Sequence, residues 1–230
     1  MGLLNVKITI LGKSLQYVAP DLCAGCSFFG TILCEHCKYD INYESFEGCV
    51  LCANPTFVGI CNKHTDAPFS RAWVVGERHG ALLNLLDEYK FQRVARADSI
   101  LAELLDVRLP FLPANTVVIP VPTNRSHVRQ RGYDHCLRIA REFARRRQLA
   151  FDSPLESHSR WTQHFSNKAD RQRQVKNAFS LTKTLDVSRP HLIIDDIVTT
   201  GATLLAVAEA LRQAGVSEIW AAAVARQPLD

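Results

Sequence analysis

Residues 191–204 constrain the fold more than any other part of the sequence. Residues 192–194 are consecutive and apolar, which is typical of a strand buried on both faces of a parallel sheet. Asp195 and Asp196 follow, and a loop of small residues at 199–203 comes next. Helical spacing then predicts the core face of a helix and the glycine that ends it, namely Leu204, Val207, Ala208, Leu211 and Gly215. The stretch therefore predicts strand, turn and helix in an α/β fold.

The loop has the composition of a phosphate-binding turn. Small side chains let such a loop fold tightly and aim several backbone N–H groups at one point beside a helix N-terminus. Asp195 and Asp196 suit the hydroxyl groups of a sugar, directly or through a metal ion. The alternative is an ordinary strand–turn–helix with an acidic tip. The residues predicted to bind the phosphate are Thr199, Thr200, Gly201, Ala202 and Thr203.

Seven of the eight cysteines lie between residues 23 and 61, in pairs with the spacing of zinc knuckles. A histidine completes the fourth pair, so eight ligands are available, enough for two tetrahedral zinc ions. Disulfides are the alternative, but the sequence has no sign of secretion, and cytosolic thiols stay reduced. The predicted zinc ligands are Cys23, Cys26, Cys34, Cys37, Cys49, Cys52, Cys61 and His64.

Spacing alone leaves the pairing of these ligands open. The sequential scheme gives one ion to the first four ligands and a second ion to the last four. An interleaved scheme and a single-ion version are the alternatives. Because protein side chains fill all four positions of each site, the zinc is expected to be structural. A module of this size buries too little apolar surface to fold without metal.

Beyond the cysteines, apolar strands and amphipathic helices alternate. Strands are predicted at residues 72–76 and 116–119, and helices at 81–91 and 99–107. This alternation predicts a parallel sheet with helices on both faces, whose ligands bind at the carboxyl ends of the strands. We therefore expect a cysteine-rich module with its lead-in at residues 1–67 and an α/β domain at residues 68–230.

Positive charge is concentrated in one block of the chain. Residues 125–176 hold thirteen Lys/Arg and five Asp/Glu, net +8, whereas residues 1–70 have a net charge of −2. Such a block suits phosphorylated ligands or nucleic acid. No run approaches the roughly 18 apolar residues of a membrane span, and residues 1–20 lack an apolar core of signal-peptide length. We therefore expect a cytoplasmic protein without a membrane span.

Three motifs resemble known families. Asp-Asp-x-x-Thr-Thr-Gly-x-Thr, from Asp195 to Thr203, resembles the loop of type I phosphoribosyltransferases that binds phosphoribosyl pyrophosphate (PRPP). Pro120-Val121-Pro122, followed by the block from Arg129 to His135, is similar to ComF-type competence proteins. That family joins a cysteine-rich finger to a phosphoribosyltransferase-like domain. A third block, from Gln163 to Phe179, is also similar, so the resemblance spans residues 20–226.

The resemblance implies a set of ligand contacts. Asp195 and Asp196 would hold the ribose hydroxyls, and residues 199–203 the 5′-phosphate. Val121 would shape the pyrophosphate loop, and Lys90 matches a lysine of the family, although an ordinary surface lysine is the alternative. Mg²⁺ would bridge ribose and pyrophosphate oxygens. With the two acids, the candidate catalytic residues are Arg129 and Arg131, which would carry the pyrophosphate unless they form a solvated basic surface.

The sequence departs from the family pattern at three positions. Asp134 and His135 stand where the family has Asn and Gln, and Gln174 stands where it usually has Asn. These departures leave the fold as expected. They put in doubt a catalytic role for that region.

A helix predicted at residues 134–147 places Cys136, Ala140 and Phe143 on its core side. Arg138, Arg141 and Arg145 share another side, which either tracks a nucleic-acid backbone or is simply solvated. Residues 160–165 interleave basic and aromatic side chains, as in single-strand binders or in a loop that closes on a substrate.

Two functions therefore fit the sequence. The first is a ComF-type role in the uptake of single-stranded DNA, beside a competence helicase, with PRPP or another phosphorylated sugar as a bound ligand. The second is an active Mg²⁺-dependent phosphoribosyltransferase with an unknown acceptor. No acceptor-recognition motif stands out in the sequence.

Overall fold

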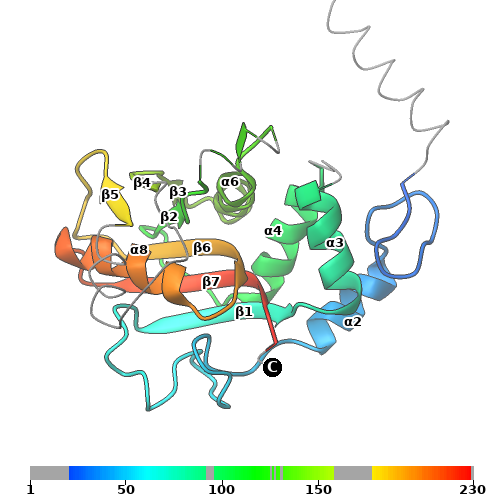
Figure 1. Ribbon diagram of the computed structural model, residues 1–230, viewed down its shortest axis with the longest axis horizontal. Coiled ribbons are helices and arrows are strands. Elements are labelled where there is room, and N and C mark those ends of the chain that lie inside the picture. Colours follow the sequence, from blue (N-terminus) through cyan, green and yellow to red (C-terminus); the bar gives the residue numbers. More distant parts are fainter. Residues whose placement is uncertain are drawn as a thin grey trace, which may run out of the picture.

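The computed structural model describes residues 21–91, 96–124, 126, 128–129, 132–157 and 178–228 of the 230-residue chain. Figure 1 shows a twisted sheet with helices packed on both of its faces. Along the chain, the helices and strands are α2 (Glu35–Tyr43), β1 (Arg71–Glu77), α3 (Gly80–Phe91), α4 (Ala97–Arg108), β2 (Val117–Pro120), α6 (His135–Arg147), β3 (Ala150–Phe151), β4 (Leu155–Ser157), β5 (Phe179–Leu181), β6 (His191–Val198), α8 (Ala202–Gln213) and β7 (Ile219–Arg226).

The main sheet has five strands in the order β1-β7-β6-β2-β3, and every neighbouring pair is parallel. β4 and β5 form a separate antiparallel pair. The predicted parallel sheet is thus confirmed. β6 lies at its centre, where its residues pair with β7 on one side and with β2 on the other.

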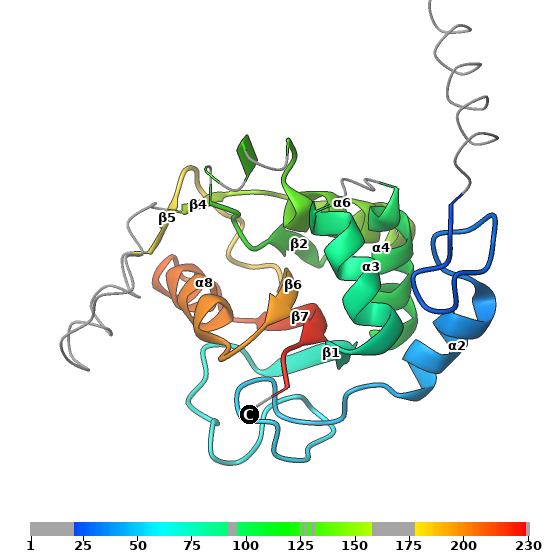
Figure 2. The ribbon, with the colours of Figure 1, turned by 45° about the vertical axis from the view of Figure 1, so that its right-hand side comes forward.

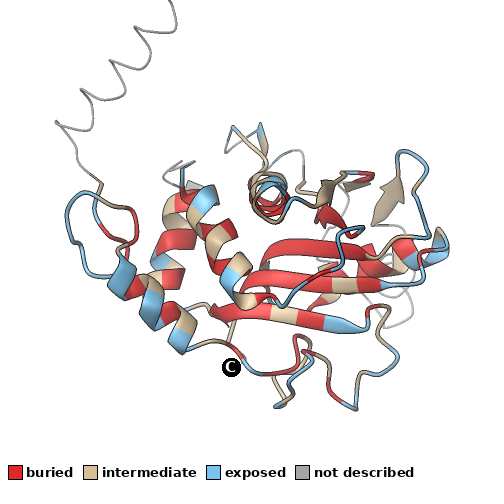
Figure 3. Ribbon diagram, turned by 180° about the vertical axis from the view of Figure 1, so that it is seen from behind, coloured by how far each residue is buried: buried red, intermediate tan, exposed pale blue. Residues whose placement is uncertain are grey.

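The two faces of β6 explain its uninterrupted apolar run. Leu192 and Ile194 pack into a cluster with residues of α2, α3, α4 and α6, whereas Ile193 packs into a second cluster with residues of α8. Because successive side chains of a strand point to opposite faces, a central strand between two helical layers buries apolar side chains at consecutive positions. Figure 3 shows this burial along the strands and on the inward sides of the helices.

The cysteine-rich segment is built into both layers. Leu33 and Ile41 join the cluster beneath α3 and α4, whereas Phe46, Val50 and Phe69 join the cluster beneath α8. Figure 2 shows α2 beside α3 and α4, and the chain between α2 and β1 passing the C-terminal end of β7. The two halves of this segment therefore pack on opposite faces of the sheet.

The predicted helix boundaries have clear local causes. Asp134, one of the departures from the family pattern, is the N-cap of α6, and its carboxylate accepts from the N–H of Leu137 at 3.0 Å. Gly215 has a φ of 99° just after α8, as expected for the glycine that ends a helix. Among the described residues, no helix combines the length and apolar character that a bilayer crossing requires.

Candidate functional site

The loop predicted to bind phosphate joins the carboxyl end of β6 to the N-terminus of α8. Gly201 is the N-cap of α8 at a φ of 74°, a backbone conformation that glycine adopts without strain. Thr199 and Thr200 are exposed, and the Thr200 hydroxyl accepts from the N–H of Ala202 at 3.4 Å. The first N–H groups of a helix have no partner within that helix, so this end of α8 presents donors to an anion.

Both acids belong to β6, and both are buried. One carboxylate oxygen of Asp196 contacts Lys90 Nζ of α3 and lies 2.9 Å from His135 Nε2 of α6. Asp195 accepts from the N–H of Asp196 at 2.9 Å, and the thiol of Cys136 lies 3.5 Å from the same oxygen. The two acids therefore differ: Asp196 anchors two helices, whereas the donors that Asp195 meets among the described residues are neutral.

This difference sets the charge of the pair. Burial raises the pKa of Asp195 to about 8, and the neighbouring charge of Asp196 adds to the rise. Burial acts in the same direction on Asp196, but Lys90 and His135 outweigh it and hold the pKa of Asp196 well below its usual range. Near neutral pH the pair therefore carries one proton, on Asp195, and one negative charge, on Asp196.

The raised pKa predicts that wild-type protein loses stability, relative to the Asp195→Asn variant, as the pH rises. The unfolded chain ionises Asp195 near its ordinary pKa of 3.8, whereas the folded protein keeps the proton up to about pH 8. Asp195 therefore contributes fully to the free energy of unfolding below pH 3.8. This contribution falls as the pH rises and is lost near pH 8. Urea unfolding of both proteins between about pH 5 and pH 8 measures this difference. Equal pH dependence in the two proteins would contradict the assignment.

The other predicted ligand residues are distributed unevenly. Val121 is buried, and its N–H donates to the carbonyl of Ile194 at 2.9 Å, so it lies beside the start of the acid pair. Lys90 reaches Asp196, as described above. Arg129 is exposed, whereas Arg131 and residues 160–165 lie outside the described residues.

Sequence reasoning did not assign His135 and Cys136 to this site. Their side chains, together with Asp196, offer ligand atoms within 4.8 Å of one another. The signal for His135 was present, because the family pattern also has a polar residue at that position. Since the Lys90 ammonium group already contacts Asp196, this group is better described as an ion-pair network than as a metal site.

The predicted zinc ligands gather into two groups, one from the first four ligands and one from the last four, each with donor atoms within 4.8 Å of one another. Tetrahedral zinc with Zn–S bonds of about 2.3 Å requires thiolate sulfurs about 3.8 Å apart. Cys26 and Cys34 have sulfurs 3.6 Å apart, as do Cys52 and Cys61. His64 Nδ1 lies 3.4 Å from the sulfur of Cys61. Both groups fit tetrahedral zinc, in the sequential scheme.

The arginines of α6 are engaged to different degrees. Arg138 forms a 2.5 Å ion pair with Asp98 of α4 and is half-buried. Arg141 is exposed, with its guanidinium group 5.2 Å from the centre of the Phe151 ring. Arg145 is exposed and pairs within its own helix at 2.7 Å. Arg141 and Arg145 are therefore accessible to a ligand, whereas Arg138 ties α6 to α4.

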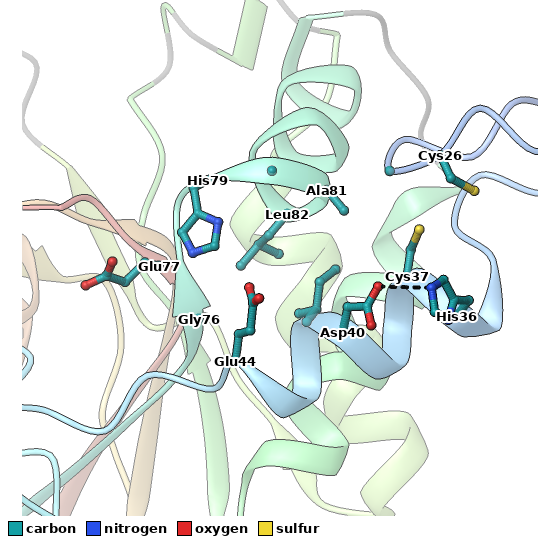
Figure 4. A pocket seen from close by; sticks show the side chains of 13 residues that line it. Cys26, His36, Cys37, Asp40, Glu44, Gly76, Glu77, His79, Ala81 and Leu82 are labelled. Atoms are coloured by element: carbon teal, nitrogen blue, oxygen red, sulfur yellow. Dashed lines mark ion pairs between the residues drawn. The ribbon is translucent and has the colours of Figure 1, made fainter.

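A separate cavity of about 370 Å³ lies between α2, the end of β1 and the start of α3. Figure 4 shows Asp40 and Glu44 projecting from the end of α2 toward the start of α3, with His36 paired to Asp40. That pair spans 3.6 Å. The cavity borders the first cysteine group through Cys26 and Cys37. None of the residues predicted to hold a sugar phosphate lines it.

Comparison with known proteins supplies an independent description of the chain. The family model of the phosphoribosyl transferase domain matches residues 147–230, which include β6, α8 and the loop between them. The chain is 26% identical to competence protein F of Haemophilus influenzae, over 98% of this chain and 99% of that protein. It is 31% identical to the DNA utilization protein YhgH of Escherichia coli, over 66% of this chain and 71% of that protein. The Salmonella typhi protein of the same name is 32% identical over the same shares.

Proposed function

Because the chain belongs to the ComF family of competence and DNA-utilization proteins, and carries a phosphoribosyl transferase domain, we propose that it acts in the cytoplasm in the uptake and handling of single-stranded DNA during natural transformation. Its phosphoribosyltransferase domain binds PRPP or another phosphorylated sugar, together with Mg²⁺. The names of its relatives support a role connected with DNA.

One observation carries the ligand proposal. Gly201, at the N-terminus of α8, follows a short loop after the central strand, whose carboxyl-terminal half carries the buried acid pair. Ligands of parallel sheets bind at this end of the strands, and the N-terminus of a helix favours a phosphate. The loop would hold the 5′-phosphate, and the acid pair would hold the ribose hydroxyls. Mg²⁺ would screen the charge of the pyrophosphate.

Titration calorimetry with PRPP and Mg²⁺ tests this assignment. We expect Asp195→Ala to weaken binding at least about tenfold, because it removes one of the two carboxyl groups that would hold the ribose hydroxyls. Asp186→Ala, at an exposed aspartate remote from the loop, is the matched control and should bind as wild type. Failure of the wild type to bind PRPP, or equal affinity in Asp195→Ala, would refute the assignment.

The two ligand groups support structural zinc, one ion in each. The sulfur–sulfur separations of 3.6 Å are those of tetrahedral coordination. When bound, zinc would supply cross-links within the cysteine-rich segment, in addition to its packing on the two faces of the sheet.

The surface of α6 supports the DNA proposal. Arg141 and Arg145 are exposed on α6, which lies within the basic block. For a single strand, each phosphate neutralised contributes about 0.7 to the slope of log affinity against log salt. We expect the double variant Arg141→Ala/Arg145→Ala to lower the slope of single-stranded DNA binding by about 1.4, measured by filter retention at several salt concentrations.

The control for this experiment is Arg71→Ala, because Arg71 is an exposed arginine at the amino end of β1. It should leave the salt slope unchanged. A flat slope in the wild type, or no decrease in the double variant, would rule out α6 as the DNA surface.

The cysteine-rich module is better suited to a protein partner than to DNA. Residues 1–70 have a net charge of −2. Aromatic side chains are exposed on the module, namely Phe28, Phe29, Tyr39, Tyr43 and Phe57. Contiguous exposed apolar groups mark interaction surfaces, and the rings of Tyr39 and Tyr43 stack 6.1 Å apart on α2. A competence helicase is the partner we propose for this surface.

Turnover of PRPP is the second candidate function, and the state of Asp195 favours it. A buried carboxyl group whose pKa is raised to about 8 is suited to proton transfer near neutral pH. Pyrophosphate release in the presence of candidate acceptors is the test. Binding without release, for every acceptor, would favour a ligand-binding role.

A further inference from the structure

The turn that carries two ligands of the second cysteine group contacts the phosphate loop. Leu51 lies between two of its ligands, Cys49 and Cys52. A Cβ atom built on Gly201 would lie only 2.2 Å from Cδ2 of Leu51. The leucine side chain thus fills the space beside the glycine, and it is half-buried there.

Val50, next to Leu51, packs against residues on both sides of the phosphate loop. Val50 is buried in one apolar cluster with Val198, which precedes the loop, and Leu204, which follows it. The Val50 carbonyl accepts from Nε of Arg226 at 3.3 Å. Arg226 is itself fully buried at the end of β7, stacked 5.5 Å from the centre of the Phe46 ring.

The turn from Cys49 to Cys52 depends on its own short-range bonds. The N–H of Cys49 donates to the carbonyl of Asn54 at 2.7 Å, and the N–H of Ala53 donates to the carbonyl of Cys49 at 2.8 Å. A metal ion on Cys49 and Cys52 would fix the same turn through both ends. The contacts of Val50 hold one side of Leu51, and the ion would also hold Cys52 on its other side.

We propose that the turn at residues 49–52 is one wall of the sugar-phosphate site, and that metal in the second group controls the affinity of the site by holding this wall in place. Leu51 is the positioning residue. It keeps residues 199–203 in the conformation whose N–H groups converge on the phosphate. This inference rests on the proposed binding of a phosphorylated sugar, and it adds a control that the phosphoribosyltransferase domain does not contain by itself.

The first cysteine group packs elsewhere. Asn84 of α3 donates to the carbonyl of Ala24 at 2.9 Å, and Gly25 lies against Ala81 at the start of the same helix. Loss of metal from the first group should therefore disturb the packing of α3 more than the conformation of the phosphate loop. The two groups can be separated by experiment.

The first measurement is PRPP affinity by calorimetry, in the presence of Mg²⁺ and with the zinc content of each protein determined. Leu51→Ala should weaken binding about tenfold while keeping about two zinc ions, and Leu51→Met should restore most of the affinity. Cys52→Ser should lose one zinc ion and weaken binding more than Cys26→Ser does. Phe57→Ala, at an exposed residue of the same module, is the control and should bind as wild type.

The second measurement is amide hydrogen exchange of residues 199–203 without ligand. Leu51→Ala and Cys52→Ser should both speed exchange there, whereas Phe57→Ala should not. Unchanged exchange in Leu51→Ala, or equal losses of affinity in Cys26→Ser and Cys52→Ser, would overturn the inference. Absence of PRPP binding in the wild type would instead overturn the proposed function, because the exchange measurement needs no ligand.

Discussion

Cys49→Ser is expected to remove one of two zinc ions and to lower the free energy of unfolding by several kcal/mol. Cys49 is fully buried, and its sulfur lies 3.6 Å from Nδ1 of His64. Structural zinc contributes roughly 10–16 kcal/mol of apparent binding free energy in small peptides, and that energy becomes folding energy when the site forms only in the folded chain. Replacing one thiolate with a serine hydroxyl removes much of this zinc-binding free energy. Elemental analysis and denaturant unfolding measure the two effects.

Cys136→Ser is the matched control, because Cys136 is a buried cysteine outside both metal groups. It should retain about two zinc ions per chain. Retention of both ions in Cys49→Ser would show that this cysteine is not a ligand.

Lys90→Met is expected to destabilise the protein by about 3–5 kcal/mol, because it leaves a buried carboxylate without its main cation. The side chains of Lys90 and Asp196 are 12% and 7% exposed, so water cannot replace the lost partner. Among the described residues, His135 is the ion-pair partner that remains beside Asp196. Chemical unfolding at neutral pH measures the loss. It should shrink as the pH falls, since without Lys90 the carboxyl group of Asp196 takes up a proton more readily.

Lys183→Met is the control for this prediction. Lys183 pairs with Asp152 at the surface, where its side chain is 53% exposed. Such pairs contribute at most about 1 kcal/mol. Comparable losses in the two variants would mean that the Lys90 pair is not a buried network.

The fold was largely predictable because its main signals are local. The apolar run at residues 192–194 predicts a strand buried on both faces, and the structure confirms it. The helical spacing after Gly201 predicts the buried face of α8, which the structure also confirms. β7 was not predicted. Its central residues, 221–223, are alanines, which lack the β-branched or aromatic character that marks a strand.

The site was predictable only in part, because its decisive contacts join distant segments. The acids and the loop are recognisable as one motif. Nothing in the spacing shows that Asp196 meets Lys90 and His135, or that Leu51 reaches Gly201. The grouping of the cysteines was likewise open until the chain was folded, since both schemes use the same spacing.

The strand order has a consequence for how the protein is made. Among the described strands, β1 joins the main sheet through β7, which comes last of them along the chain. While the ribosome is still adding residues 219–226, β1 therefore has no strand to pair with, although more than a hundred residues after it have already been synthesised. We expect the layer of helices beside β1 to stay partly assembled, with apolar surface open to chaperones, until β7 emerges. Zinc bound early by the nascent chain would order the cysteine-rich segment before β7 is made, and so shorten the time for which its apolar side chains are exposed.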